Sequence, residues 1–178
     1  GRTSCLADPA FRRVISGAMN RQQLSTLGES GFAAPATSTS GLTPQQSAYL
    51  GSLKNNIEVS GWSKAKVASA MTAAGYTLNA KNFYQVTSDK AQAATGLPAG
   101  TQCQFVIQDP VAYSDYAEDM LLISQQLQAN HIKVTSQGVS TGQWNANIST
   151  HNFDAIIHWG AGGSNPYTQY QNWLDDPG

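Results

Sequence analysis

Three stretches of this chain decide its fold: TQCQFVIQ (residues 101–108), which ends at Asp109-Pro110, HIKVTSQGV (131–139) and FDAIIHW (153–159). Polar and apolar residues alternate in the first stretch, and the third is apolar enough for a strand buried on both faces. Between them, residues 114–130 and 141–149 carry apolar residues at helical spacing. This order predicts an α/β or α+β domain in which helices pack on a mostly parallel sheet.

The rest of the chain carries further helix signals. At Asp8-Pro9, an aspartate suited to an N-cap precedes a proline suited to the first helical position. Apolar residues then recur at helical spacing through Met19. Similar signals predict helices from Asn20 to Gly28, from Thr43 to Leu50, from Ser63 to Gly75 and over 167–174, and a short strand over 83–86.

Composition limits what the protein can be. The chain has 178 residues, which suits one domain with its own core. Ten basic against eleven acidic residues leave a net charge of −1, so nucleic-acid binding is not expected. Only 12% of the residues are charged, and this uncharged but polar composition resembles that of secreted and cell-surface proteins. The longest aliphatic run, Met120 to Ile123, is too short to span a bilayer.

Cysteine and histidine content is low. Cys5 and Cys103 allow one disulfide in an oxidising compartment, or remain two thiols in a reducing one. If they are bridged, the chain-entropy model gives a stabilisation of about 4 to 5 kcal/mol. His131, His151 and His158 lack the spacing of metal ligands. The sequence therefore predicts neither a metal site nor a cofactor.

The motifs of common enzymes are incomplete. The glycines of residues 160–163 follow a strand, but neither a closing Gly-Lys-Ser/Thr nor a GxGxxG pattern accompanies them, so a nucleotide site is not predicted. Ser63 and Lys66 match the Ser-x-x-Lys of serine acyl-enzymes without its partner motifs, and a helix N-cap explains the pair better. No carboxylate pair stands out as acid and base. The protein is not expected to be an enzyme.

Aromatic residues crowd the last 35 positions of the chain. Core packing explains some of them. A ring beside a glycine turn, with His158 and Asn165 nearby, also suits a stacking platform for apolar sugar faces or peptide side chains. The residues concerned are Trp144, Trp159, Tyr167, Tyr170 and Trp173.

Four segments, taken in order, carry a resemblance to a known family. They are DPAFRRVISGAMNR (8–21), WSKAKVASAMTAAGY (62–76), ISQQLQANHIKV (123–134), and Trp144 followed by Asn152-Phe153-Asp154. Each match is loose, but together they are specific. The chain resembles the bacterial extracellular solute-binding proteins of family 5, which are receptors for oligopeptide, nickel and oligosaccharide ABC importers.

The resemblance implies a fold and a setting. The fold would be one lobe of a periplasmic-binding-protein-like type II fold, with a mixed sheet flanked by helices. Family members are much longer, so residues 1–178 are expected to be a single lobe, a fragment of a two-lobed protein. The expected partners are the other lobe of the same chain and the permease subunits in the membrane. The expected location is extracytoplasmic, as a cell-surface lipoprotein or a periplasmic protein.

In this family the cleft between the lobes closes on the ligand, and the loop after the Phe-Asp strand supplies cleft residues. Peptide-binding members commonly carry an acidic residue in that loop, where Gly162 or Gly163 stands here. This departure and the retained aromatics favour an oligosaccharide, with an oligopeptide as the alternative. Trp159 and Trp144 are expected to stack on the ligand. The other expected ligand-binding residues are Gly160, Gly162 and Gly163 of the loop, and His158, Asn165 and Tyr167, which would bond hydroxyl groups.

Two interpretations of other kinds stay open at this point. A small hydrolase on an α/β domain would need a histidine close to a serine or a carboxylate. A structural or adhesive secreted domain would bury Trp144 and Trp159 in its core, whereas a binding platform would leave both on one open face.

Overall fold

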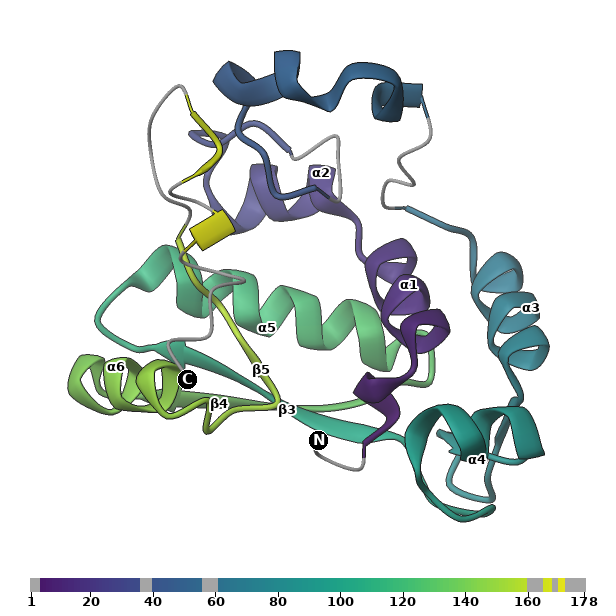
Figure 1. The fold of residues 1–178 in the computed structure, drawn as a ribbon. Coiled ribbons are helices and arrows are strands. Elements are labelled where there is room, and N and C mark those ends of the chain that lie inside the picture. The colour runs from purple at the N-terminus through teal and green to yellow at the C-terminus, as the bar shows by residue number, and fades with distance from the viewer. Residues whose placement is uncertain (1–3, 36–39, 56–60, 160–164, 168–169, 172–178) are drawn as a thin grey trace.

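The three predicted strands form one parallel sheet. β3 (Gln104–Pro110) lies in the middle, between β4 (Lys133–Val139) and β5 (Ala155–Ile156) (Figure 1). The computed structural model describes residues 4–35, 40–55, 61–159, 165–167 and 170–171.

Two helices cover the sheet, one on each face. α5 (Ser114–Gln128) connects β3 to β4, and α6 (Thr141–Ser149) connects β4 back to β5 on the far side of β3. Because such crossovers are right-handed, this reversal puts the helices on opposite faces (Figure 1). On α5, Met120 and Leu127 are buried as the predicted apolar stripe requires.

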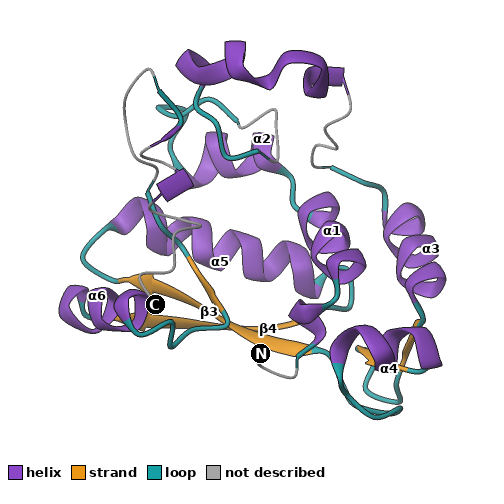
Figure 2. Cartoon of the chain, viewed as in Figure 1, coloured by secondary structure: helices purple, strands orange, loops and turns teal. Residues whose placement is uncertain are grey.

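The amino-terminal half contributes mostly helices, which pack on one another, while α1 also contacts α5 (Figure 2). β1 and β2 pair as an antiparallel hairpin. The elements are a 3-10 turn (Cys5–Ala7), α1 (Pro9–Ala18), α2 (Arg21–Gln23), a π-helical turn (Leu24–Gly28), a 3-10 segment (Pro44–Asn55), α3 (Lys64–Ala74), β1 (Tyr76–Leu78), β2 (Tyr84–Val86) and α4 (Asp89–Thr95).

Capping residues start and stop these helices where the sequence predicts. The carboxylate of Asp8 accepts the backbone N–H of Ala10 at 2.8 Å and so begins α1. The hydroxyl of Ser63 accepts the N–H of Lys66 at 3.2 Å, which makes this pair a helix start. Gly75 ends α3 with a φ of +97°, a left-handed conformation that favours glycine.

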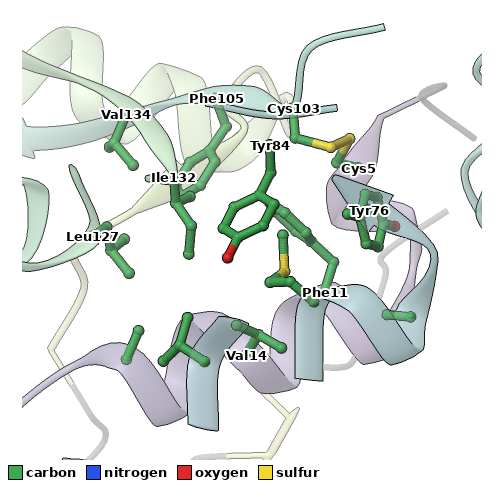
Figure 3. Packing of buried hydrophobic residues seen from close by; sticks show 14 of the residues in the cluster. Cys5, Phe11, Val14, Tyr76, Tyr84, Cys103, Phe105, Leu127, Ile132 and Val134 are labelled. Carbon is green, nitrogen blue, oxygen red and sulfur yellow. A yellow bond between two sulfur atoms is a disulfide. The ribbon is translucent and has the colours of Figure 1, made fainter. Parts of the chain in front are cut away.

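One continuous apolar core joins the two halves (Figure 3). The rings of Phe11 and Tyr76 lie with centroids 5.4 Å apart, and both residues are fully buried. The hydroxyl of Tyr76 donates to the carboxylate of Asp8 at 2.6 Å. Burial, and then this bond, raise the pKa of Tyr76, which stays protonated and satisfied inside the core.

A disulfide between Cys5 and Cys103 closes the core (Figure 3). The sequence left the pairing of the two cysteines open, and the structure brings their Cα atoms to 5.6 Å. Both cysteines are buried, and Cys103 directly precedes β3. The bridge therefore fastens the amino-terminal turn to the beginning of the central strand.

Other predictions fare unevenly. The third strand is not long and buried on both faces: β5 has two half-buried residues and pairs with β3 only through Ile107 and Gln108. That prediction was wrong because β5 has a strand neighbour on one side only within the described residues.

The hairpin strand β1 and helix α4 were not predicted. The predicted helix over 167–174 lies largely outside the described residues, and no described helix is long and apolar enough to cross a bilayer.

Removing the disulfide should weaken the fold. In the double variant Cys5→Ser/Cys103→Ser, the unfolded chain loses a cross-link between residues 98 apart, so the free energy of unfolding should fall by about 3 to 5 kcal/mol. Urea unfolding followed by circular dichroism measures this change. Reductant should bring the parent chain to the stability of the variant and leave the variant unchanged. A parent chain whose unfolding midpoint ignores reductant would contradict the proposed role of the bridge.

Candidate ligand-binding site

The carboxyl ends of the parallel strands define the candidate site. β3 ends at Pro110 and β5 at Ile156, so the residues that follow each strand emerge at the same edge of the sheet. The backbone N–H of Tyr113 bonds the carbonyl of Pro110 at 3.1 Å, which turns the chain into α5 at this edge. Ligands of open α/β sheets commonly bind at such an edge.

Five rings gather there in what we call the aromatic cluster. The ring centroids of Trp144 and Trp159 are 4.5 Å apart, and Trp159 lies 5.9 Å from Tyr113 and 6.4 Å from Tyr116. His158 stacks on Trp144 with centroids 5.0 Å apart and an interplanar angle of 26°. The cluster thus consists of Tyr113, Tyr116, Trp144, His158 and Trp159, contributed by α5, α6 and the segment after β5.

The cluster has a buried base and an open outer surface. Trp144 is 1% exposed, and its indole N–H donates to the carbonyl of Ile157 at 3.0 Å, which fixes the ring below the others. Trp159 and Tyr113 are 42% and 41% exposed, and we call these two rings the outer surface of the cluster. The two tryptophans therefore do not share one open face: Trp159 is free to stack on a ligand, and Trp144 supports it from below.

His158 lies within the cluster rather than beside a catalytic partner. Its Nδ1 contacts the carbonyl oxygen of Trp159, and its ring is sandwiched against Trp144. His131, the other histidine with a ring contact, bonds the carbonyl of Asn82 at 3.1 Å. These contacts do not make the serine or carboxylate pairings that a hydrolase would need.

The remaining predicted residues fall elsewhere. The backbone carbonyl of Asn165 accepts the side-chain amide of the buried Gln46 at 3.3 Å, so this segment packs against the residues near 40–46. The Asn165 side chain accepts the N–H of Tyr167 at 2.9 Å, and Tyr167 is two-thirds exposed. The predicted loop residues Gly160, Gly162 and Gly163 lie outside the described residues.

A buried carboxyl group lies close to the cluster and was not predicted as a site residue. Asp109, near the end of β3, is 0% exposed, and neither carboxylate oxygen has a hydrogen-bond partner within the described part of the chain. Burial, and then the negative charge of Asp115, raise the pKa of Asp109 to about 6. Burial, and then the charge of Asp115, raise the pKa of Tyr116, and the charge of Asp109 adds a smaller contribution in the same direction.

Amide side chains secure the opposite face of the same strand. Gln108 accepts the side-chain amide of Asn147 on α6 at 2.8 Å and donates its own to Gln137 on β4 at 3.1 Å. Gln143 donates to Asn147 at 2.7 Å. Since neighbouring residues of a strand face opposite ways, Gln108 turns toward α6 and Asp109 toward α5. These amides hold α6, and with it Trp144, at a fixed place on the sheet.

Topology could have identified the missed residues. The predicted helix over 114–130 included Tyr116 without assigning it to a site, and Tyr113 and Asp109 carried no motif. Each of them lies at the carboxyl end of β3, at the edge where His158 and Trp159 also emerge. Only the parallel pairing of β3 and β5 brings these two segments of the sequence together.

A groove of about 500 Å³ between α1 and α3 is a less suitable site for a polar ligand. Four of its nine lining residues are alanines, and its single aromatic ring, Trp62, is covered by the ammonium group of Lys66 at 4.2 Å. No group of three or more acidic, histidine or cysteine residues that could hold a metal ion occurs among the residues that the structure describes.

A family comparison decides the class of protein. The sequence profile of the bacterial extracellular solute-binding proteins, family 5 (middle region), matches residues 2–178. This chain belongs to that family. Its relatives are solute-binding proteins of ABC transporters and not enzymes, which confirms the expectation of a non-enzymatic protein. Among curated proteins, none matches the chain by sequence.

Solved structures of solute-binding proteins share the fold. The mannohexaose-bound periplasmic oligopeptide-binding protein of Thermotoga maritima matches with a TM-score of 0.73 at 15% identity, over 93% of this chain and 30% of that one. The oligopeptide-binding protein AppA of Bacillus subtilis, in complex with a nonapeptide, matches with a TM-score of 0.65 at 15% identity, over 87% and 28%. This chain therefore spans somewhat less than a third of the length of these two solute-binding proteins.

Ionisation of Asp109 should make stability depend on pH. Its pKa of about 6 in the folded chain exceeds its ordinary value of 3.8, so the folded state binds this proton more tightly than the unfolded state. The resulting stabilisation is complete below about pH 4 and disappears as the pH rises past about 6, a loss of up to about 3 kcal/mol. Asp109→Asn should flatten this part of the decline.

Urea unfolding at pH 4.0 and pH 7.5 checks this expectation. Burial, and then Glu29, also raise the pKa of Asp119, so part of the decline should persist in Asp109→Asn. Asp89→Asn, an exposed change on α4 that is remote from both carboxyl groups, serves as the matched control and should keep the parent profile. Equal declines in the parent chain and in Asp109→Asn would show that Asp109 does not titrate as its burial implies.

Proposed function

We propose that this chain is one lobe of a two-lobed receptor that captures an oligosaccharide and delivers it to an ABC permease. The observation that carries the proposal is the outer surface of the aromatic cluster, where Trp159 and Tyr113 are about two-fifths exposed above the buried Trp144. Flat rings that are open on one side and fixed on the other suit the apolar faces of sugar rings.

Several features support a sugar as the ligand. The loop position that is acidic in peptide-binding members is Gly162 or Gly163 here. Hydroxyl groups would be bonded by His158, Asn165 and Tyr167, with Gly160 and the loop glycines allowing close approach of the backbone. The Thermotoga maritima neighbour was solved with mannohexaose bound, which shows that a protein of this fold accommodates a sugar chain.

The proposed mechanism is capture by closure of two lobes. The ligand first rests on the aromatic surface of this lobe, and the other lobe then closes over it and excludes water. No covalent chemistry takes part. The receptor would work outside the cytoplasm, either in the periplasm or as a lipoprotein on the cell surface, and would present the closed form to the membrane permease.

An oligopeptide is the second candidate ligand. AppA, which shares the fold, was solved with a nonapeptide. The buried carboxyl group of Asp109, near the end of β3, also gives this lobe an acidic group at the edge of the sheet where the cluster lies, although not in the loop where peptide-binding members carry theirs.

Titration of the complete receptor separates the two candidates. Cello- and manno-oligosaccharides and unmodified di- to pentapeptides would be added in turn while tryptophan fluorescence is followed. A saturable response to oligosaccharides is expected, since Trp159 would lose water contact on binding. A saturable response to peptides alone would overturn the oligosaccharide proposal and leave the receptor assignment in place.

Truncation of the exposed tryptophan should weaken binding. Trp159→Ala removes the larger ring of the outer surface, and we expect the dissociation constant for the bound oligosaccharide to rise at least about tenfold. Leu78→Ala, an exposed apolar change on β1, is the matched control and should leave affinity unchanged. Isothermal titration calorimetry measures both. An unchanged affinity in Trp159→Ala would remove the aromatic cluster from the ligand site.

A further inference from the structure

We propose that Gln108 and Asn147 are positioning residues of the ligand site, which set the place of Trp159 against Trp144 through one closed circuit of hydrogen bonds. The inference rests on the proposed function in that it takes the aromatic cluster as the ligand surface. It adds what holds that surface in shape: two buried amide side chains that lie outside the cluster.

The circuit runs from β3 to β5, on to α6 and back to β3. The backbone carbonyl of Gln108 accepts the N–H of Ile157 at 2.9 Å, and the carbonyl of Ile157 accepts the indole N–H of Trp144 at 3.0 Å. Asn147, three residues further along α6, donates its side-chain amide to the side chain of Gln108 at 2.8 Å. Gln108 therefore holds the segment after β5 with its backbone and α6 with its side chain.

Helix α6 sits on the sheet through contacts that are largely polar. Its buried residues are Trp144 and Asn147, which lie on one face of the helix because they are three positions apart. Both side chains donate hydrogen bonds of the circuit. Hydrogen bonds are directional, whereas apolar burial is not, so these contacts fix the angle and height of the helix more narrowly than apolar packing alone. Without the amide pair, α6 would keep one large apolar anchor and gain freedom to shift.

The place of Trp159 depends on the same residue of β3. β5 has two residues and pairs with β3 through Ile107 and Gln108. The bond from the N–H of Ile157 to Gln108 is made two residues before Trp159. The ring of Trp159 then meets that of Trp144 with centroids 4.5 Å apart and an interplanar angle of 38°. A shift of α6 against β3 would change this separation directly.

The far ends of the two amides are bonded as well. The side chain of Gln108 donates to Gln137 at 3.1 Å, and that of Asn147 accepts from Gln143 at 2.7 Å. A buried amide network whose members bond one another favours one arrangement over its alternatives. A surface that is already held in its binding arrangement loses less freedom when a ligand binds, so it binds more tightly. Gln108 and Asn147 thus act on affinity through the rings that they position.

A hydrogen bond between α5 and β4 separates positioning from general stability. The hydroxyl oxygens of Ser124 on α5 and Ser136 on β4 lie 2.7 Å apart, and Ser124 is buried. This bond also ties a helix to the sheet, but it lies outside the circuit. Ser124→Ala is therefore the matched control, which should cost stability without moving α6.

The test uses the complete receptor and the variants Gln108→Met and Asn147→Ala. Methionine keeps the length of the glutamine side chain and removes both of its hydrogen bonds. Alanine is the best helix former, so Asn147→Ala should fold even if the change within β3 is not tolerated. Thermal unfolding of each variant measures its stability.

Two readouts report on the site. The first is the circular dichroism that arises when the electronic transitions of two close indoles couple, because this signal depends steeply on their separation and angle. The part of the spectrum that is lost in Trp159→Phe defines the signal of the pair. The second readout is calorimetry with cellotetraose and with mannohexaose, the sugar bound to the Thermotoga maritima neighbour.

Both amide variants should lose at least about half of the coupled indole signal, and their dissociation constant for the bound sugar should rise at least about fivefold. Ser124→Ala should keep the signal and an affinity within about twofold of the parent receptor, even where its thermal midpoint falls as far. The indole signal is recorded without ligand. If neither sugar binds the parent receptor, that result counts against the proposed function, and the indole signal still decides the positioning role.

Three results would overturn the positioning role. One is an unchanged indole signal in a folded amide variant. Another is an equal loss of signal in Ser124→Ala, since the arrangement of the indoles would then follow general stability. The third is a lost indole signal with unchanged affinity for a sugar that binds the parent receptor, which would separate the amides from the ligand site.

Discussion

Hydrogen bonding of β3 along both of its edges is the constraint on which the rest of this lobe depends. Pairing with β4 sets where α5 must begin and end, and the short pairing with β5 returns residues 157–159 to the turn at 110–113. The disulfide at Cys103 holds the beginning of the strand. A displacement of β3 would therefore disturb the bridge, the helices on both faces and the aromatic cluster together.

Local signals were enough for the helices and for the order of the strands. Asp8 and Ser63 begin their helices through hydrogen bonds made within three residues, so the neighbouring sequence is enough to predict where each helix starts. The length of β5 depends on a partner far along the chain, and its apolar sequence could not show that it would pair through two residues. Trp144 and Trp159 looked alike in sequence and differ in exposure, because Trp144 lies on α6, which packs against β3, whereas Trp159 follows the short strand β5. Asp109 was predicted only to end a strand, because the lack of a hydrogen-bond partner for its carboxylate among the described residues arises from the fold and not from a local motif.

The net charge of this chain does not describe how its charged residues are distributed. A net charge of −1 suggested a surface with little electrostatic preference. The charges are instead unevenly placed, with carboxylates around the start of α5 and with Arg13 and Lys90 along the groove between α1 and α3. A few charges of one sign that are grouped together can act on a ligand more strongly than many dispersed charges of mixed sign, because neighbouring opposite charges cancel one another.

The placement of the disulfide has a consequence for how such a chain matures. Cys5 and Cys103 are separated by 98 positions, and the partner of Cys5 directly precedes the central strand. A polypeptide that crosses a membrane from its amino terminus exposes Cys5 to oxidants long before Cys103 arrives. During that interval Cys5 is open to mixed disulfides with small thiols or with other chains. The Cys5–Cys103 bond can form only after Cys103, which directly precedes β3, has emerged. Its formation is therefore tied to the appearance of the central strand of the lobe.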